Sequence, residues 1–502
     1  MARNNKQLYP DFSAFVDVID REGITPELLS KIINRHRPNA KYNEKLYDRY
    51  LMKEGAVPIE EREPRFKEEN PINNKISNDF FGEIVDFKTG YFAGEPIGYS
   101  YSSTDEAEDV TGGTEAVDKA TKALTDFTTL NNMYGVDMET TKFATIYGYT
   151  GRLFYVDPEK NARVMPVHGF ETIILSKTDI SEPKYAIRYY KTYDINNSVT
   201  WVVEFYDNAF IHTYEGYLNG LRFVEKRLHL FDYCPLQGIA NNKEMIGDAE
   251  KVISLIDDYN KVLSDNSNEI EGFVHAIMLT SILGEEKEVN TALEKANTSG
   301  ILNVPPVGTV QVNEPVKWVT KNINDQFTEH HLQRLEDNIY RFSRTPNLGD
   351  ESFGSASGVS LKFKLHGLET KCGMFEAKML DASQYGFKVL ASYWRKRRIE
   401  FDPLQVTLDF KRNFPLDRLS EAQAAQAEIA AGMPKRYVYG RMAGVDDVDY
   451  LMELLEQEQE DITGLYDDLP TPNDKSGNNT NNKATNEELD ETEEKTGDQK
   501  KK

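Results

Sequence analysis

The stretch that decides the fold is residues 345–379, which read TPNLGDESFGSASGVSLKFKLHGLETKCGMFEAKM. Up to Gly358 the stretch is rich in glycine and serine and predicts a loop. After it, apolar side chains recur at alternating steps of four and three residues, which places them on one face of a helix. They are Leu361, Leu365, Leu368, Cys372, Phe375 and Met379. Such a stripe is typical of core or subunit packing.

The predicted helix runs from Val359 to Arg398. Gly367, Gly373 and Gly386 each weaken it by about 1 kcal/mol relative to alanine, so we expect bends or close helix contacts there. The helix ends in a basic run, which either contacts phosphate groups or complements the negative end of the helix dipole. The sequence leaves both interpretations open. The run is Arg395, Lys396, Arg397 and Arg398.

Upstream, helical patterns give way to strand-like ones. Thr25 and Pro26 predict a helix start, and Arg37-Pro38 predicts its end. A helix from Phe80 is predicted to end at residues 88–90. Runs rich in Tyr, Val, Ile and Phe then recur about every ten residues, which predicts an antiparallel meander. They span 151–156, 172–175, 185–190, 200–206 and 210–214.

Two further helices are predicted at 248–271 and 323–343, where apolar residues recur at helical spacing. Short strand-like runs between them indicate a small β-rich insert, at 273–279, 300–304, 309–312 and 315–319. After the long helix, the sequence predicts a strand at 405–410, helices at 420–431 and 446–461, and a disordered acidic tail from 464 to 502. The fold class is therefore α+β.

Composition excludes several classes of protein. Lys and Arg total 59 and Asp and Glu total 83, so the net charge is −24, unlike a protein that grips nucleic acid through a basic field. It does not exclude one that touches DNA without gripping it. Cys234 and Cys372 make no disulfide framework and no CxxC pair, which favours a reducing compartment without structural zinc. No signal peptide or transmembrane run is evident.

The search for catalytic motifs finds no phosphate-binding P-loop, no GxGxxG and no HExxH. The Gly354–Gly358 segment has alanine where a nucleophile elbow needs serine. The neighbours His330 and His331, like Asp257 and Asp258, diverge by roughly 100° around a helix, so a solvated face is the better interpretation. We expect no catalytic residue, no metal site and no cofactor.

Two segments resemble the portal proteins of tailed bacteriophages, of the type found in long-tailed phages of Gram-positive hosts. Residues 84–97 resemble the family's helix running into Tyr-x-x-Gly-(Glu/Asn)-Pro, here Tyr91 to Pro96. Residues 345–369 resemble its Pro-containing loop, Ser-Gly step and long helix. A weaker match is the helix around residues 255–259. The order of elements agrees over most of residues 25–460.

The resemblance implies a portal fold with wing, helical stem, β-rich clip, tunnel helix and crown. The implied parts are an N-terminal helical segment (1–63), the wing (64–247), a stem helix (248–272), the clip (273–320), a second stem helix (321–344), the tunnel loop (345–358), the long helix (359–398), a returning strand (399–414), crown helices (415–463) and the tail (464–502).

It also implies residue roles. Residues facing the DNA channel would be Asn347, Asp350, Glu351, Ser352, Phe353, Ser355 and Ser357. Phosphate contacts would come from Lys362, Lys364 and the basic run Arg395, Lys396, Arg397 and Arg398. Partner docking would fall on the clip, at Glu285, Glu286, Lys287 and Glu288.

The implied function is non-enzymatic: a ring of identical subunits, expected to be dodecameric, at one capsid vertex of the virion, through which DNA is packaged and ejected. The implied partners are the terminase large subunit, a head-completion or adaptor protein, the major capsid and scaffolding proteins, and double-stranded DNA without sequence preference. Assembly would occur in the host cytoplasm, with no membrane involved. The alternatives are another virion protein, such as a minor capsid protein or tail adaptor, and a metal-dependent nuclease with dispersed ligands.

Overall fold

The computed structural model describes residues 11–59, 72–102, 113–178, 182–272, 277–280, 301–303, 316–319, 325–349, 358–413 and 418–440, with short pieces between 442 and 457. The chain divides into two compact units, Met1–Pro415 and Leu416–Lys502, which are described separately. Helices and mainly antiparallel sheets occur together, which confirms the α+β class.

The N-terminal helices are α1 (Ser13–Glu22) and α2 (Pro26–Tyr50). The Oγ1 of Thr25 accepts a hydrogen bond from the N–H of Leu28 at 3.2 Å, which confirms the predicted cap. The predicted end at Pro38 is wrong, because α2 continues through this proline.

Pro38 costs α2 about 3 kcal/mol through one lost backbone hydrogen bond and a steric clash. It lies on the exposed side of the helix, where water reaches the unpaired carbonyl. On the other side, Leu29, Ile33 and Ala40 are fully buried before and after the proline. Burying each large apolar side chain contributes roughly 1.5–3 kcal/mol, so packing outweighs the local penalty.

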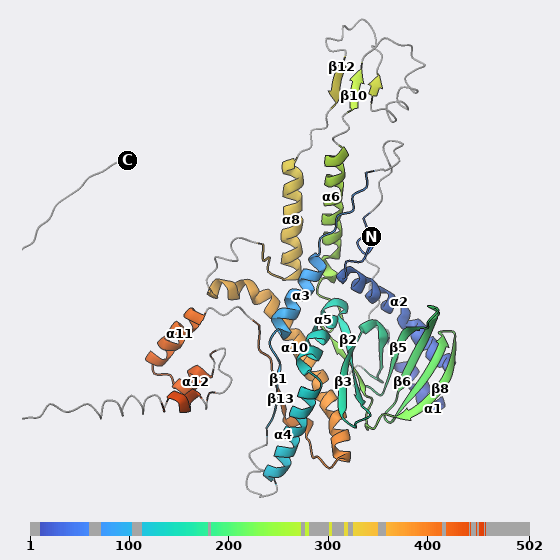
Figure 1. Ribbon diagram of the computed structural model, residues 1–502, viewed down its shortest axis with the longest axis vertical. Coiled ribbons are helices and arrows are strands. Elements are labelled where there is room, and N and C mark those ends of the chain that lie inside the picture. Colours follow the sequence, from blue (N-terminus) through green and yellow to red (C-terminus); the bar gives the residue numbers. More distant parts are fainter. Residues whose placement is uncertain are drawn as a thin grey trace, which may run out of the picture. The chain divides into compact units, whose positions relative to one another are not determined.

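Four of the five runs predicted to form a meander lie in one antiparallel sheet, whose strand order is β4-β5-β6-β7-β8. The first predicted run, 151–156, instead belongs to a second sheet, so its place in the meander was wrong. The strands of the five-stranded sheet are β4 (Thr172–Leu175), β5 (Tyr185–Tyr193), β6 (Val199–Tyr206), β7 (Phe210–Tyr217) and β8 (Gly220–Leu228). The last strand was not predicted, because its sequence mixes charged and apolar residues without strict alternation. Figure 1 shows α1 and α2 lying against this sheet, and their apolar side chains share a core with Ile187, Val203 and Phe205.

A second sheet has the order β3-β2-β9, with β2 (Tyr149–Val156), β3 (Ala162–Val167) and β9 (Leu236–Ala240). Helices α4 (Gly113–Leu130) and α5 (Met133–Tyr147) precede it. The turn from α5 into β2 requires Gly148, whose φ is +79° and where a Cβ would lie 2.3 Å from the backbone of Met245. This turn holds the second sheet against the backbone of Met245, in the segment that leads into the helix from Ile253.

Helix α3 (Phe80–Ala93) continues past the predicted end at residues 88–90. The carboxylate of Asp79 caps its start by accepting from the N–H of Gly82 at 2.8 Å. Gly90 remains helical because Phe92 and Ala93, two and three residues later, are buried in the core. As with Pro38, tertiary packing overrides a local signal for helix termination.

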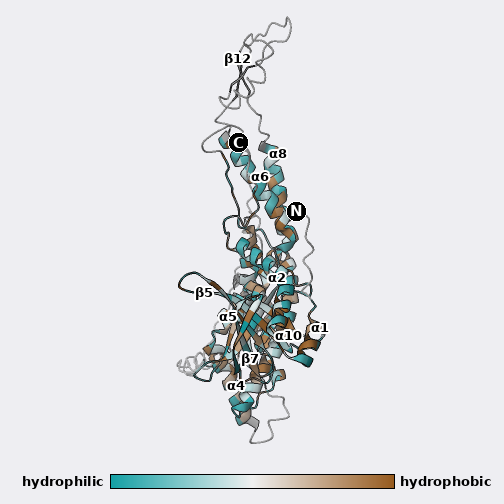
Figure 2. Ribbon diagram, turned by 90° about the vertical axis from the view of Figure 1, so that its right-hand side faces the viewer, coloured by the Kyte–Doolittle hydropathy of each residue, from teal (hydrophilic) through white to brown (hydrophobic). Residues whose placement is uncertain are grey.

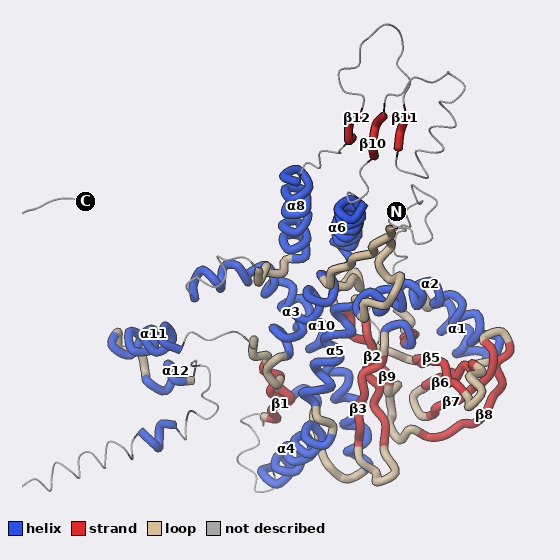
Figure 3. The backbone as a smooth tube through the Cα atoms, turned by 45° about the horizontal axis from the view of Figure 1, so that its top comes forward, coloured by secondary structure: helices blue, strands red, loops and turns tan. Residues whose placement is uncertain are grey.

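Helix α6 (Ile253–Gly272) and helix α8 (Asp325–Ser343) lie side by side (Figure 1) and confirm the predicted helical pair. Figure 2 shows that hydrophilic residues predominate along both. Between them in sequence lie β10 (Ile277–Thr280), β11 (Ile301–Asn303) and β12 (Val316–Val319), which form a three-stranded sheet with β10 in the centre (Figure 3). The predicted strand at 309–312 lies outside the described residues.

An extended segment, residues 72–79, is bound along α6 by a polar ladder. The backbone N–H groups of Asn74, Ile76 and Asn78 donate to the side chains of Asn268, Ser264 and Asn260 at 2.5, 2.9 and 2.8 Å, respectively. The three acceptors are spaced by four residues, so they lie on one face of the helix and are nearly fully buried. Every second backbone N–H of residues 74–78 donates to α6. The ladder therefore requires this segment to be extended.

The long helix, α10 (Gly358–Lys396), confirms the prediction to within two residues at its C-terminus. The stripe from Leu365 to Met379 is buried within the same chain, against Phe92, Ala93 and Ile239. It is therefore core packing and is not available to a neighbouring subunit. Gly386 lies close to β2 and β9, since a Cβ there would be 2.6 Å from Gln237 and 2.8 Å from Phe154.

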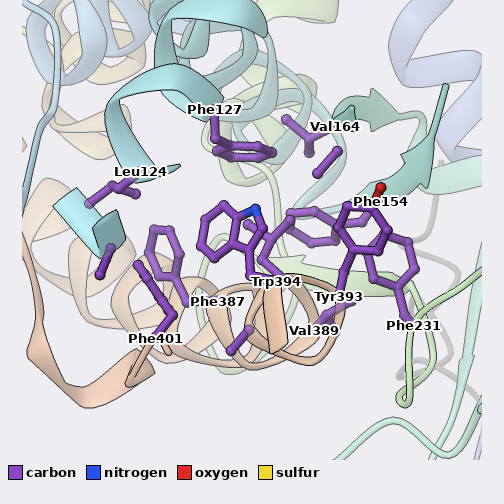
Figure 4. Close-up of a cluster of buried hydrophobic side chains, with 14 of the residues drawn as sticks. Leu124, Phe127, Phe154, Val164, Phe231, Phe387, Val389, Tyr393, Trp394 and Phe401 are labelled. Carbon is purple, nitrogen blue, oxygen red and sulfur yellow. The ribbon is translucent and has the colours of Figure 1, made fainter. Parts of the chain in front are cut away.

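The C-terminal half of α10 closes an aromatic core with α4 and the second sheet (Figure 4). The ring of Trp394 packs edge-on against Phe127 of α4 at 6.1 Å and against Phe401 at 4.5 Å. The predicted strand at 405–410 is β13 (Val406–Asp409), which pairs antiparallel with β1 (Gly98–Tyr101). Chain segments about 300 residues apart thus enclose one core.

In the second unit, α11 (Arg418–Ala430) and α12 (Lys435–Tyr439) are joined through Gly432, whose φ is +92°. Of the predicted helix at 446–461, residues 451–455 are helical and most of the rest lie outside the described residues. The tail from 464 onward lies outside them as well.

Candidate functional site

The first part of the 344–358 loop is held against the end of α8. Arg344 has a φ of +58°, and the N–H of Thr345 donates to the carbonyl of Tyr340 at 3.2 Å, which ends the helix. Asn347 donates from Nδ2 to Glu336 at 3.0 Å, and its Oδ1 accepts from the N–H of Gly349 at 2.8 Å. Of the predicted channel residues, Asn347 is therefore engaged with α8.

The remaining predicted channel residues, Asp350, Glu351, Ser352, Phe353, Ser355 and Ser357, lie outside the described residues. So do the predicted docking residues Glu285, Glu286, Lys287 and Glu288. Lys364 is half-buried in the second turn of α10, whereas the side chain of Lys362 is not described. The structure thus describes the two flanks of the loop, up to Gly349 and from Gly358. The role of the residues between them in a DNA channel stays a prediction.

A buried charge cluster anchors both flanks. Its centre is Asp248, in the segment that enters α6, and the carboxylate lies 2.6 Å from the ammonium groups of both Lys88 and Lys371. Lys88 belongs to α3, and Lys371 lies on α10. The side chains of Lys88 and Asp248 are almost inaccessible, and that of Lys371 is 14% exposed. An ion cluster buried this deeply must be fully paired to be tolerated.

The remaining hydrogen-bonding capacity of the cluster is also used. Lys88 donates to Asn241 at 2.6 Å and lies 5.0 Å from the ring centre of Phe375, a cation–π distance. Lys371 donates to the backbone carbonyl of Ser343, the last residue of α8, at 2.7 Å. One carboxylate cannot neutralise two cations, and the second cation therefore lies at the negative end of the α8 dipole.

Electrostatics keep Asp248 ionised. Burial alone would raise the pKa of its carboxyl group, but the two lysine ammonium groups lower that pKa from 3.8 to about 2. The N–H of Asp248 also donates to the carbonyl of Thr145 at the end of α5, at 2.9 Å. The cluster therefore connects α3, α5, the start of α6, the end of α8 and α10.

A second ion group binds the chain beyond β13 to α10. The guanidinium of Arg412 donates to Glu369 at 3.1 Å and to Glu376 at 2.6 Å, both on α10. It also lies 4.9 Å from the ring centre of Phe92. Because Arg412 comes just before the boundary between the two units, it fixes the last residues of the first unit to the long helix.

The basic run at 395–398 lies at the C-terminus of α10, with all four side chains exposed. Lys396 pairs with Asp232 at 2.6 Å, and Arg397 donates to the carbonyl of Lys160 at 3.2 Å. Arg398, with a φ of +62°, follows the helix. The dipole interpretation fits this position, and two of the four cations already bind protein groups.

The other candidates bring no ligand set together. His331 lies 3.6 Å from Asp258 of α6, a surface contact between the paired helices. Among the described residues, no group of three or more His, Cys, Asp or Glu side chains could hold a metal ion. A search of the same residues for a helix with the length and apolarity needed to cross a membrane finds none.

Sequence reasoning missed the charge cluster. Lys88 lies inside the first motif that carries the family resemblance and Lys371 lies two residues after the second, but their partner Asp248 is 160 and 123 residues away. One feature of the sequence could have revealed the cluster: Lys88 lies in the middle of an otherwise apolar helical face that runs from Ile84 to Phe92. Such a lysine is rarely buried without a partner.

Comparison with known proteins agrees with this arrangement. The sequence profile described as "Phage portal protein, SPP1 Gp6-like" matches residues 29–465. The portal protein of Clostridium phage phiCD119 is 22% identical over 83% of this chain and 92% of its own length. The portal protein of Bacillus phage SPP1 is 23% identical over 88% of each chain.

A solved structure titled "Neck of empty GTA particle computed with C6 symmetry" covers 71% of this chain and 88% of its own, with 9% identity and a TM-score of 0.37. A likeness this remote adds nothing to the assignment. The profile match covers most of the sequence, and the chain therefore belongs to the phage portal protein family.

Proposed function

We propose that the protein assembles into a closed, dodecameric ring at one vertex of a phage capsid and forms the channel through which DNA is packaged and ejected. The observation that carries this proposal is the family match over residues 29–465, which spans both paired helices, the loop and the long helix. The protein is a structural component of the virion, and an ATPase that drives packaging is a separate protein.

The parts of the ring follow from the order of the elements. In this proposal α6 and α8 form the stem, the sheet of β10, β11 and β12 is the clip, and the 344–358 loop is the tunnel loop. Residues 415–463 form the crown, and the tail from 464 follows it. The wing comprises the two larger sheets and their helices. The clip is where the terminase large subunit docks during packaging and a head-completion protein docks afterwards. Major capsid and scaffolding proteins contact the assembled ring.

The electrostatics suit a channel. Each phosphate that a protein neutralises releases counterions and tightens binding, so a basic lumen would retain DNA. With a net charge of −24 per subunit, a ring repels the duplex and keeps it centred. Asp350 and Glu351 in the tunnel loop would face the DNA in this proposal. Positions 354 and 358 are glycine and give the loop backbone freedom as DNA passes.

The anchored flanks of the loop suit the same role. Asn347 is tied to α8, and Lys371 ties α10 to the end of α8 and to Asp248. A loop that contacts moving DNA transmits force to its ends. The buried cluster at those ends spreads that force over the helices of the subunit, so the loop moves while its base stays fixed.

The first test is the assembly state of the purified full-length chain. Light-scattering mass and negative-stain class averages are expected to show a species of many subunits and end-on views with a central hole. A chain that stays monomeric with scaffolding and capsid proteins present would contradict the proposal. Open or filamentous assemblies would instead favour a minor capsid protein or a tail adaptor.

A further inference from the structure

The outer edge of the five-stranded sheet is an exposed strand. β8 is last in the order β4-β5-β6-β7-β8, and Figure 1 shows it at the rim of the sheet. Of its nine residues, only Leu221 is buried. An edge strand of this length presents a row of backbone donors and acceptors that another strand can pair with.

Apolar side chains lie along this edge. Phe223, Val224 and Leu228 are 54%, 50% and 60% exposed. The register places Phe223 opposite Tyr214 and then shifts, so that Glu225 lies opposite Thr213 and Val224 has no residue across from it. Val224 is thus the extra residue of a β-bulge, a feature that re-aims side chains at sheet edges.

The two faces of β8 differ. Leu221, Phe223, Lys226 and Leu228 lie opposite β7 residues of one face, the face that carries the buried Tyr214. Leu221 is buried in the core beneath α2, whereas Phe223 and Leu228 continue the same face uncovered. The sheet therefore extends an apolar surface beyond the helix that covers it.

The edge is basic in an acidic protein. β8 carries Arg222, Lys226 and Arg227 but only one carboxylate, Glu225, while the chain as a whole has a net charge of −24. Glu225 lies 3.5 Å from Arg227, and Lys226 lies 3.9 Å from the ring centre of Phe210. The strand therefore carries a net charge of +2 beside its exposed apolar side chains.

We propose that β8 is a docking edge for an extended, acidic segment of a partner protein, which adds to the sheet as a sixth strand. Main-chain hydrogen bonds would supply affinity. An alternating partner strand would set its acidic side chains beside Arg222 and Arg227 on one face and its apolar side chains beside Phe223 and Leu228 on the other. A second copy fits poorly, because pairing two β8 strands would place like charges side by side. The proposal does not depend on ring formation.

The test uses a nine-residue fluorescent peptide that alternates valine and glutamate, titrated into the full-length protein and followed by anisotropy. We expect saturable binding that weakens at least tenfold between 50 and 300 mM salt. A peptide with lysine in place of glutamate is expected to bind at least tenfold more weakly at low salt. Absence of saturable binding by the glutamate peptide would overturn the proposal.

Location is tested by hydrogen exchange and by charge reversal. Peptide binding is expected to slow amide exchange in residues 222–228, and protection elsewhere would overturn the proposal. The double variant Arg222→Glu/Arg227→Glu is expected to reduce affinity at least tenfold. Lys122→Glu/Lys243→Glu makes the same change in charge at exposed sites on other elements and is expected to leave affinity within twofold. Equal losses in both variants would mean non-specific attraction.

Two further experiments test whether DNA or a second copy of this chain binds β8 instead. If a short DNA duplex binds the same edge, and its binding is lost in Arg222→Glu/Arg227→Glu, the occupant would be nucleic acid and not a protein segment. A concentration-dependent dimer abolished by the same variant would replace it with a second copy. Either result overturns the proposal as stated.

Discussion

The ammonium group of Lys371 lies 2.7 Å from the backbone oxygen of Ser343, so the long helix α10 is tied directly to the last residue of α8. The same ammonium group binds Asp248 at 2.6 Å, and Asp248 binds Lys88 of α3. The loop between α8 and α10 therefore begins and ends in elements joined by one buried cluster.

Replacing Lys371 with methionine is expected to destabilise the protein by about 1–3 kcal/mol, because it leaves the carbonyl of Ser343 without its donor and Asp248 with one cation instead of two. Urea denaturation of the full chain measures the loss. Lys378→Met is the matched control on the same helix, since Lys378 pairs with Asp381 only at the surface, at 3.5 Å. Similar stabilities for the two variants would show that the cluster contributes little.

The cluster predicts a specific acid sensitivity. The folded-state pKa of Asp248 is about 2, below the ordinary 3.8. A lowered pKa stabilises the fold above pH 4, and that contribution, roughly 2 kcal/mol, is lost as the pH falls from about 4 to 2. Asp248→Asn cannot titrate, so the difference in unfolding free energy between wild type and variant should shrink over this range. A constant difference would contradict the assignment.

Gly373 and Gly386 are a matched pair in the interior of α10. A Cβ at Gly373 would meet no atom within 4 Å, so Gly373→Ala is expected to stabilise the chain by about 0.5–1 kcal/mol through helix propensity. A Cβ at Gly386 would lie 2.6 Å from Gln237 and 2.8 Å from Phe154. Gly386→Ala is therefore expected to lower the melting temperature, whereas Gly373→Ala raises it.

If Gly373→Ala stabilises the dissociated subunit but weakens the ring, a neighbouring subunit packs against this face of α10. If it stabilises both forms, the face is free in the assembly. Light-scattering mass at equal protein concentration distinguishes the two results.

The polar ladder on α6 predicts that losing one of its hydrogen bonds loosens residues 74–78 more than the rest of the fold. Ser264→Ala removes the acceptor of the Ile76 N–H and should cost about 1–3 kcal/mol, the penalty for an unsatisfied buried donor. Amide exchange at residues 74–78 should accelerate more than exchange in the five-stranded sheet. Ser254→Ala, at an exposed position on the same helix, is the control. Uniform acceleration throughout the chain would mean that the ladder supports the whole fold.

The proposed tunnel loop is tested by deletion. Removing residues 351–356 leaves the capped segment 344–349 and the start of α10 in place, so rings are expected to form while DNA packaging falls strongly. Packaged DNA per particle and ring yield are measured on the same preparations. Loss of the ring would make this loop a structural element, and normal packaging would remove it from the DNA path.

Local patterns predicted much of the secondary structure. The cap at Thr25, the alternating strands from β4 to β7 and the apolar stripe of α10 each depend on residues a few positions apart, and each was confirmed. The same local rules failed at Pro38 and at Gly90. There, burial of side chains by distant parts of the chain outweighed a local penalty of a few kcal/mol or less.

The sequence by itself determined the α+β class, the paired helices, the long helix, most strands of the larger sheet, and the family, because periodicity and short motifs are properties of neighbouring residues. Only the tertiary structure decided that the α10 stripe is internal core, that Asp248 unites Lys88 and Lys371, and that α6 binds residues 72–79. These contacts join residues more than a hundred positions apart. Each depends on burial, which gives a charge or an amide its partner and which no local pattern encodes.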